Sequence, residues 1–201
     1  MKNIVLDCER MKYPDTGIYH YCLNLGAAIQ HKLTETDLQL HFFSPPHSKI
    51  SFNKGQHTIA QHSFQKWWMP DTRKFDLWHG TYQNTAYLPK RNRRIRVVLT
   101  IHDLNFLYDE RKSPMKKQKH LRHLQHNINR ADALVCISDY CRNDVWKHCD
   151  TKGKKLHLIY NGTNHLSQAS LNRQSYQPQR PFLFSVGVLC RKKNLHALLP
   201  L

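Results

Sequence analysis

Polar side chains that could bind a ligand or move a proton follow four apolar segments of the chain, where each segment ends. They are His79 after 76–78, His102 and Asp103 after 95–101, Ser138 after 133–137, and Asn161 after 156–160. A single histidine in such a place is most often a hydrogen-bonded structural residue. Four consecutive segments that all end in imidazole, carboxylate, hydroxyl or amide groups favour a polar binding cleft.

A further candidate is Gly17, which opens a helical pattern after the first apolar segment, 3–6, and a polar loop. The free N–H groups at a helix N-terminus attract anions, and a glycine there lets a ligand approach the backbone closely. A plain turn from loop to helix explains this glycine equally well.

The apolar periodicity predicts strands that alternate with helices. Strands are expected at 3–6, 38–43, 76–80, 95–101, 133–137 and 156–160, and helices from Gly17, from Ser113–Pro114 and after Ser138. Pro114 suits a first helical position and Ser138 an N-cap. This alternation predicts an α/β fold with a Rossmann-like, doubly wound parallel sheet. Because ligands bind at the carboxyl ends of the strands in such sheets, the polar residues should lie along one edge.

The sequence also predicts a domain boundary. The polar segment 166–180 is typical of a linker, and a further strand, 182–187, and a helix from Asn194 follow it. We expect an N-terminal domain at 1–175 and, over 176–201, a linker with the first strand–helix unit of a truncated second domain. In the less regular region 47–72, Trp67–Pro70 is most simply a packed loop.

The composition is that of a globular protein. The 201 residues are 40% hydrophobic, and no apolar run reaches the ~18 residues of a membrane-spanning helix. The start of the chain is unlike a signal peptide, because Asp7 breaks its apolar run. Without an export signal, we expect a cytoplasmic location and six reduced thiols. None of these cysteines forms a C-x-x-C pair, so a zinc-ribbon or thioredoxin-type site is not expected.

Charge is the strongest feature of the composition. The 31 Lys and Arg outnumber the 14 Asp and Glu, which gives a formal net charge of +17 and attracts phosphates, nucleic acid or anionic membranes. Basic residues expected to face an anionic inner-membrane surface are Arg93, Arg94, Lys116, Lys117, Lys119 and Arg122, and Arg130 is also expected to point outward. Specific nucleic-acid binding is not expected, because no known nucleic-acid-binding signature occurs.

Two groups of potential metal ligands occur, and neither predicts a metal site. They are Cys136, Cys141 and Cys149, and His120, His123 and His126. The cysteine spacing matches no closed zinc site, and the histidines have no carboxylate ligand nearby. We therefore expect no metal and no cofactor.

Several motifs resemble those of family-four retaining glycosyltransferases, which have the two-domain GT-B fold. They are D-L-W-H-G (76–80), R-V-V-L-T-I-H-D-L-N-F (96–106), R-A-D-A-L-V-C-I-S-D-Y-C-R-N-D-V (130–145), L-I-Y-N-G-T (158–163) and F-L-F-S-V-G-V-L-C-R-K-K-N-L (182–195). Their order and spacing carry the resemblance, which covers the first strand and most of the chain from Asp76. They are similar to those of bacterial mannosyltransferase-like enzymes of surface polysaccharide synthesis.

The resemblance implies roles for individual residues. His102 matches the family histidine that faces the donor sugar, with Asp103 beside it. Gly17 matches a glycine near the donor phosphates. Lys193, next to Lys192, matches the lysine that neutralises the nucleotide diphosphate, since a fixed cation stabilises this leaving group. Candidates for the cleft or the acceptor are His79, Ser138 and Asn161.

The resemblance implies a hexosyltransferase that moves a sugar from a nucleotide-sugar donor to a glycan or lipid-linked acceptor with retention, in surface polysaccharide or lipopolysaccharide synthesis. Many members have a second glycine where Thr16 stands and arginine where Val188 stands. Because most of a second domain is missing, the 201 residues alone are expected to be inactive. The alternatives are a non-enzymatic basic α/β module that binds anionic membrane or nucleic acid, and another GT-B enzyme such as an epimerase.

Overall fold

The computed structural model describes residues 2–33, 36–46, 57–69, 72–163, 177–186 and 194–198. Contacts divide the chain into two compact units, Met1–Gly162 and Thr163–Leu201. The first unit carries the sheet and most of the polar residues singled out above. No helix within the described ranges is long and apolar enough to cross a bilayer.

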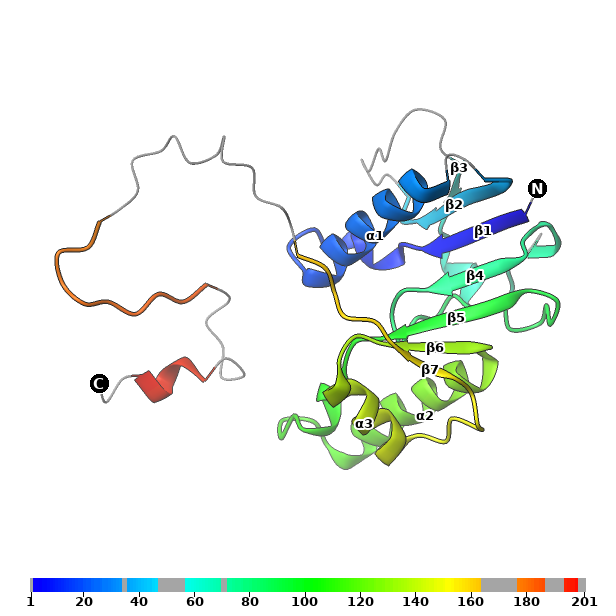
Figure 1. Ribbon diagram of the computed structural model, residues 1–201. Coiled ribbons are helices and arrows are strands. Elements are labelled where there is room, and N and C mark those ends of the chain that lie inside the picture. Colours follow the sequence, from blue (N-terminus) through cyan, green and yellow to red (C-terminus); the bar gives the residue numbers. More distant parts are fainter. Residues whose placement is uncertain are drawn as a thin grey trace. The chain divides into compact units, whose positions relative to one another are not determined.

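A parallel sheet of seven described strands forms the centre of the first unit (Figure 1). The strands are β1 (Lys2–Asp7), β2 (Leu38–Ser44), β3 (His57–Ala60), β4 (Leu77–Gly80), β5 (Arg96–Ile101), β6 (Ala133–Cys136) and β7 (Leu156–Leu158). Their order is β3-β2-β1-β4-β5-β6-β7, and every pairing is parallel. The order reverses between β1 and β4, so the predicted doubly wound α/β fold is confirmed.

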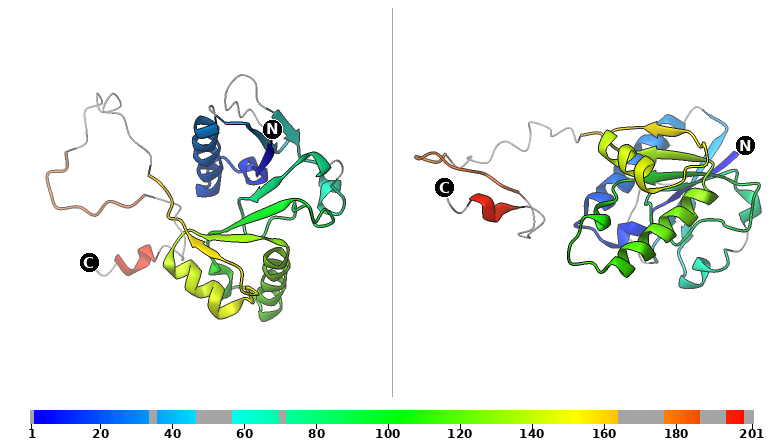
Figure 2. Two further views of the ribbon diagram at one scale, coloured as in Figure 1. Left: turned by 45° about the vertical axis from the view of Figure 1, so that its right-hand side comes forward. Right: turned by 90° about the horizontal axis from the view of Figure 1, so that it is seen from below.

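Three α-helices in the described part of the chain cover the sheet: α1 (Gly17–Leu33), α2 (Pro114–Arg130) and α3 (Asp139–His148). Val5 of β1 belongs to a core cluster with Ile128 of α2, whereas Leu6 belongs to a second cluster with Cys22 of α1. Because successive side chains of a strand point to opposite faces, α1 and α2 cover opposite faces of the sheet. Figures 1 and 2 show α1 near β1 and β2, and α2 and α3 near the other end of the sheet.

Two of these helices begin where the sequence predicts, one with Pro114 at its first position and one with Ser138 as its N-cap. The Ser113 hydroxyl accepts a hydrogen bond from the Lys116 N–H at 3.4 Å, and Pro114 occupies the first helical position. The Ser138 hydroxyl accepts one from the Cys141 N–H at 3.1 Å. Each hydroxyl satisfies an N–H that has no acceptor within its helix.

The region expected to be irregular contains regular structure. It holds β3 and the short 3-10 helices η2 (Ser63–Lys66) and η3 (Thr72–Lys74). β3 pairs with β2 at the end of the described sheet, and because its side chains are largely exposed its sequence lacks an apolar pattern. The prediction of a packed loop at Trp67–Pro70 is wrong for Trp67 and Trp68, which are exposed.

Arg130 is the second correction, because its side chain is buried and does not point outward. Its guanidinium donates hydrogen bonds to the carbonyl oxygens of Pro89, Asn92 and Ile95 at 2.8–2.9 Å. These three hydrogen bonds join the last turn of α2 to the 89–95 segment and satisfy main-chain carbonyl groups there. The other basic residues of the predicted membrane face are exposed or partly exposed: Arg93, Arg94, Lys116, Lys117, Lys119 and Arg122.

The described part of the second unit contains the 3-10 helix η7 (Leu195–Leu198), and residues 181–186 have no regular secondary structure. The strand predicted at 182–187 is therefore absent from its described part, 182–186, where no described strand pairs with it. A strand is stabilised by hydrogen bonds to a neighbour, so an apolar sequence alone does not form one. The predicted domain boundary at 175/176 lies in 164–176, outside the described residues.

Candidate functional site

The candidate site lies where β1 and β4 meet, at their carboxyl ends. The strand order reverses here, and such a reversal is where doubly wound folds bind ligands. β1 contributes Asp7, the loop after β4 contributes Thr81 to Thr85, and the end of β5 contributes His102. The polar groups of the site therefore come from the ends of three adjacent strands, β1, β4 and β5.

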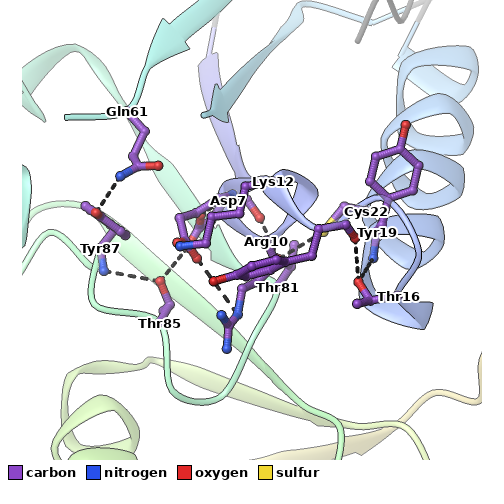
Figure 3. Close-up of polar contacts among 12 residues, drawn as sticks. Asp7, Arg10, Lys12, Thr16, Tyr19, Cys22, Gln61, Thr81, Thr85 and Tyr87 are labelled. Carbon is purple, nitrogen blue, oxygen red and sulfur yellow. Dashed lines mark hydrogen bonds and ion pairs between the residues drawn. The ribbon is translucent and has the colours of Figure 1, made fainter. Parts of the chain in front are cut away.

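Asp7 is the most buried acid of the site, with 2% of its surface exposed. The Thr85 hydroxyl donates to its Oδ2 at 2.7 Å (Figure 3). The Glu9 N–H donates to its Oδ1 at 3.0 Å. Burial raises the pKa of Asp7 to about 7, although these two hydrogen bonds oppose the rise. The carboxyl group can therefore exchange a proton near neutral pH.

The loop after β4 is tied directly to β1 and to α1. The Thr81 hydroxyl donates to the main-chain oxygen of Asp7, and the Cys22 thiol lies 3.3 Å from the Thr81 hydroxyl (Figure 3). Both contacts are buried. The same loop thus bonds to the main chain and, through Thr85, to the side chain of Asp7.

Cations border this cluster on the 3-10 helix η1 (Glu9–Lys12), which follows β1. The Arg10 guanidinium lies 4.1 Å from the ring centroid of Tyr82, a cation–π contact, and Lys12 pairs with Glu9. Arg10 is also 3.9 Å from Glu9. The tip of β1 therefore presents positive charge beside a buried carboxyl.

His102 lies at the end of β5 with its ring largely buried. Its Nε2 is 2.8 Å from the Thr81 carbonyl oxygen, which can only accept, so this nitrogen carries the proton. The ring packs edge to face against Tyr21, at 4.7 Å between centroids. Because burial lowers the pKa of His102, the ring is neutral at pH 7 and its Nδ1 remains an acceptor.

His79 lies within β4, inside the strand predicted at 76–80 and one residue before its end. Its Nε2 is 2.8 Å from the Thr100 hydroxyl, which is also 3.3 Å from the Tyr21 hydroxyl. Burial, and then the proximity of His102, lower the pKa of His79 to about 4. His79 is thus a neutral member of the network that supports the His102–Tyr21 pair.

Gln83 forms hydrogen bonds to both His102 and Asp103. It was not among the residues predicted from the sequence. Its Oε1 accepts from the His102 N–H at 3.2 Å, and its Nε2 donates to the Asp103 carbonyl oxygen at 2.8 Å. The Asp103 carboxylate accepts from the Asn105 N–H at 2.9 Å and so opens the 3-10 helix η4 (Asn105–Leu107). Gln83 is nearly fully buried, but no spacing in the sequence distinguishes it.

The other predicted residues lie farther along the edge or outside the described ranges. Gly17 is exposed at the first position of α1, and a Cβ there would meet no atom within 4 Å. Ser138 caps α3, and Asn161 is exposed after β7. Lys192 and Lys193 lie outside the described residues. The structure therefore brings the predicted residues His79 and His102 together. It also adds Asp7 to the candidate site; the sequence feature that could have indicated this residue is a single acid at the end of an apolar strand.

The described residues include no group of three His, Cys, Asp or Glu side chains placed to hold a metal ion. Of the two groups considered from the sequence, Cys141 donates to the Ile101 carbonyl oxygen at 3.2 Å. His123 hydrogen-bonds the Thr85 carbonyl oxygen at 3.1 Å, and His120 packs against Phe106. These side chains have separate partners in the fold.

Comparison with known families gives a match that covers most of the chain. The sequence model of Glycosyltransferase Family 4 matches residues 29–165, from within α1 to beyond β7. No curated protein matches the chain. The matched range includes His79, Gln83 and His102 but not Asp7.

Proposed function

Because the chain belongs to glycosyltransferase family 4, we propose that it is the acceptor-side half of a GT-B enzyme that transfers a hexose from a nucleotide-sugar donor with retention. The observation that supports this most is the neutral His102 ring at the carboxyl edge, next to the crossover between β1 and β4. This is the place where a doubly wound sheet binds a ligand.

In this proposal, His102 contacts the donor sugar through Nδ1. Its Nε2 proton is held by the Thr81 carbonyl and its ring by Tyr21, so Nδ1 can accept a hydrogen bond from a sugar hydroxyl. Asp103 fixes the loop that follows, and Gln83 ties the two residues together. These contacts position the imidazole before the substrate arrives.

The leaving diphosphate would meet positive charge. Lys193 and Lys192 are the proposed cations, with Gly17 at the start of α1 close to the phosphates. The diphosphate and the acceptor hydroxyl would lie on one face of the sugar, which gives retention without a covalent intermediate. The acceptor would contact the exposed end of the edge, where Ser138 and Asn161 lie. Neither a metal nor a cofactor is needed.

The proposed acceptor is a glycan or a lipid-linked glycan of the surface polysaccharide or lipopolysaccharide type, met at the cytoplasmic face of the inner membrane. The support is the charge of +17 and the exposure of basic residues on α2 and before β5. Each basic residue near an anionic bilayer contributes about 1 kcal/mol. The basic residues in this proposal are Arg93, Arg94, Lys116, Lys117, Lys119 and Arg122.

The test is sugar transfer by a version of the protein extended through a complete second domain. His102→Ala should lower kcat/KM about 100-fold, because it removes an oriented contact to the donor. The control is His126→Ala, which removes an exposed histidine of α2. Equal activity of both variants would contradict the role of His102. Transfer by residues 1–201 alone would contradict the expectation that they are inactive.

A further inference from the structure

Three large aromatic side chains lie exposed together on η2 and just after it. They are Phe64, Trp67 and Trp68, which we call the aromatic patch, and 53%, 75% and 48% of their surfaces are exposed. The rings of Phe64 and Trp68 pack edge to face at 5.7 Å between centroids. Grouped aromatic side chains in water are unfavourable for a folded surface unless they contact something else.

The backbone holds the aromatic patch in place. The N–H groups of Trp67 and Trp68 both donate to the Phe64 carbonyl oxygen, at 3.1 and 3.2 Å. At the start of η2 the His62 N–H donates to the Gln65 side chain, and after the patch Met69 packs against the main core. The rings are therefore presented outward by an ordered turn with a residue in the core behind it.

Basic residues outnumber acids in the sequence around the patch. The described residues in 57–69 and 72–76 include Lys66, Arg73 and Lys74 and one acid, Asp76, and the other acid in this part of the sequence is Asp71. Lys66 lies within the patch segment itself and approaches the Tyr87 ring at 5.9 Å. The patch thus combines exposed indole rings with cations, a combination that complements an anionic surface.

We propose that the aromatic patch inserts into the headgroup region of an anionic phospholipid bilayer. Indole rings have an apolar body and a polar N–H, and they are enriched at this depth of a membrane. Cations beside them attract the negative lipid headgroups. The inference rests on the proposed docking of the basic residues at a membrane and adds the apolar part of that contact, which salt does not screen.

The geometry favours a bilayer over single-stranded nucleic acid. Nucleic-acid bases stack on the open faces of aromatic rings that lie along a charged groove. Phe64 and Trp68 are inclined to each other by 75°, so the edge of one ring covers the face of the other. Insertion into lipid requires only that the rings be exposed.

The experiment is co-sedimentation of the 201-residue chain with vesicles of phosphatidylcholine containing phosphatidylglycerol, at low and high salt. The double variant Trp67→Ala/Trp68→Ala should bind at least tenfold more weakly at high salt. The matched control is Trp146→Ala, because Trp146 is 56% exposed on α3 and lies outside the patch. In brominated lipid, the fluorescence of the wild type should be quenched and that of the double variant should not.

The outcomes separate this inference from the proposed docking of the basic residues. If the double variant binds as well as Trp146→Ala at every salt concentration, the patch does not insert, and binding by charge alone remains. If the wild type binds no anionic vesicle, both ideas fail. A loss of binding to single-stranded DNA in the double variant, with no loss on vesicles, would assign the patch to nucleic acid. Circular dichroism would show that each variant is folded.

Discussion

At the scale of single residues, the end of β1 places a carboxyl group where water hardly reaches. Asp7 receives hydrogen bonds from a hydroxyl and from an N–H, and its near neighbour Glu9 is another acid. A buried carboxylate costs free energy under these conditions, so the protonated form is favoured. The hydrogen bond that joins β1 to the loop after β4, between Asp7 and Thr85, therefore involves a carboxyl group whose charge changes near neutral pH.

The first prediction concerns the pH dependence that Asp7 contributes. The pKa of Asp7 is about 7 in the folded protein and about 4 in the unfolded chain, so the folded state binds the proton more tightly. Its contribution to stability is therefore complete below pH 4 and is lost as the pH rises through 7, by up to roughly 4 kcal/mol. In Asp7→Asn this loss should disappear. Urea unfolding of the wild type and of Asp7→Asn between pH 5 and 8 measures this loss. If the free energy of unfolding depended on pH in the same way in both proteins, the raised pKa of Asp7 would be refuted.

His79 gives the opposite dependence. Its pKa is about 4 in the folded protein, below the value of about 6.5 for an unfolded histidine, so the unfolded chain binds the proton more tightly. Stability should fall as the pH drops from 6.5 to 4, by up to about 3 kcal/mol. His79→Gln should reduce this acid sensitivity, and His126→Gln, at an exposed position, should not. Thermal unfolding across this pH range makes the comparison.

At the scale of elements, the strand ends are fixed by contacts from distant helices. The last turn of α2 satisfies three carbonyl groups of the 89–95 segment through Arg130, and Asn127 of α2 donates to the carbonyl oxygens of Gln83 and Thr85. One helix thus contacts the connection between β4 and β5 both near its start, at Gln83 and Thr85, and over 89–95. The site loop is a part of this connection.

The third prediction is that Arg130→Met destabilises the protein by about 2–4 kcal/mol. The substitution leaves three carbonyl oxygens without their donor and removes the 3.6 Å ion pair with Asp132. Arg122→Met on the same helix is the control, because Arg122 is exposed. Urea unfolding at pH 7 gives both free energies. Similar small losses in the two variants would show that the three hydrogen bonds contribute little.

Local patterns in the sequence were enough to predict six of the seven strands, the three α-helices and the parallel sheet. Strong apolar runs such as Val97–Ile101 predict buried strands, and caps such as Ser138 predict helix starts. β3 was missed because an exposed strand at the end of the sheet has no apolar alternation. The wrong prediction for Arg130 has a related cause, since the carbonyls it binds are about 40 residues away in the chain.

The site was predicted less completely than the fold. His102 was proposed as a site residue because it follows a predicted strand, which is a local signal, and β5 does end just before it. Gln83 and Asp7 act through partners that only the folded chain brings near, and a lone glutamine or aspartate is common in any sequence. The hydrogen bond between His79 and Thr100 depends on the register in which β4 pairs with β5. The apolar pattern of each strand does not predict that register.

At the scale of the whole molecule, the two units differ in how much structure supports them. The first unit, ending at Gly162, contains both core clusters and all seven described strands. A unit that holds its own core is expected to fold alone. The contacts that position the candidate site are also within it.

The fourth prediction is that residues 1–163 fold without the remaining residues. Their melting temperature should equal that of the 201-residue chain within about 2 °C, because no free energy of the sheet or its helices is lost. Differential scanning calorimetry of the two proteins makes the comparison. A drop of ten degrees or more would show that residues 164–201 stabilise the first unit.

The central place of β1 also sets the time at which the site can form during synthesis. β1 is made before its partner β4, which is complete only at Gly80. At about 5–20 residues per second, the ribosome adds these residues over roughly 4–15 seconds. During this interval Val5, Leu6 and Asp7 lack the neighbour that later covers them. The pairing that forms the candidate site therefore requires that residues up to Gly80 have been synthesised, and β1 is exposed to chaperones and proteases until then.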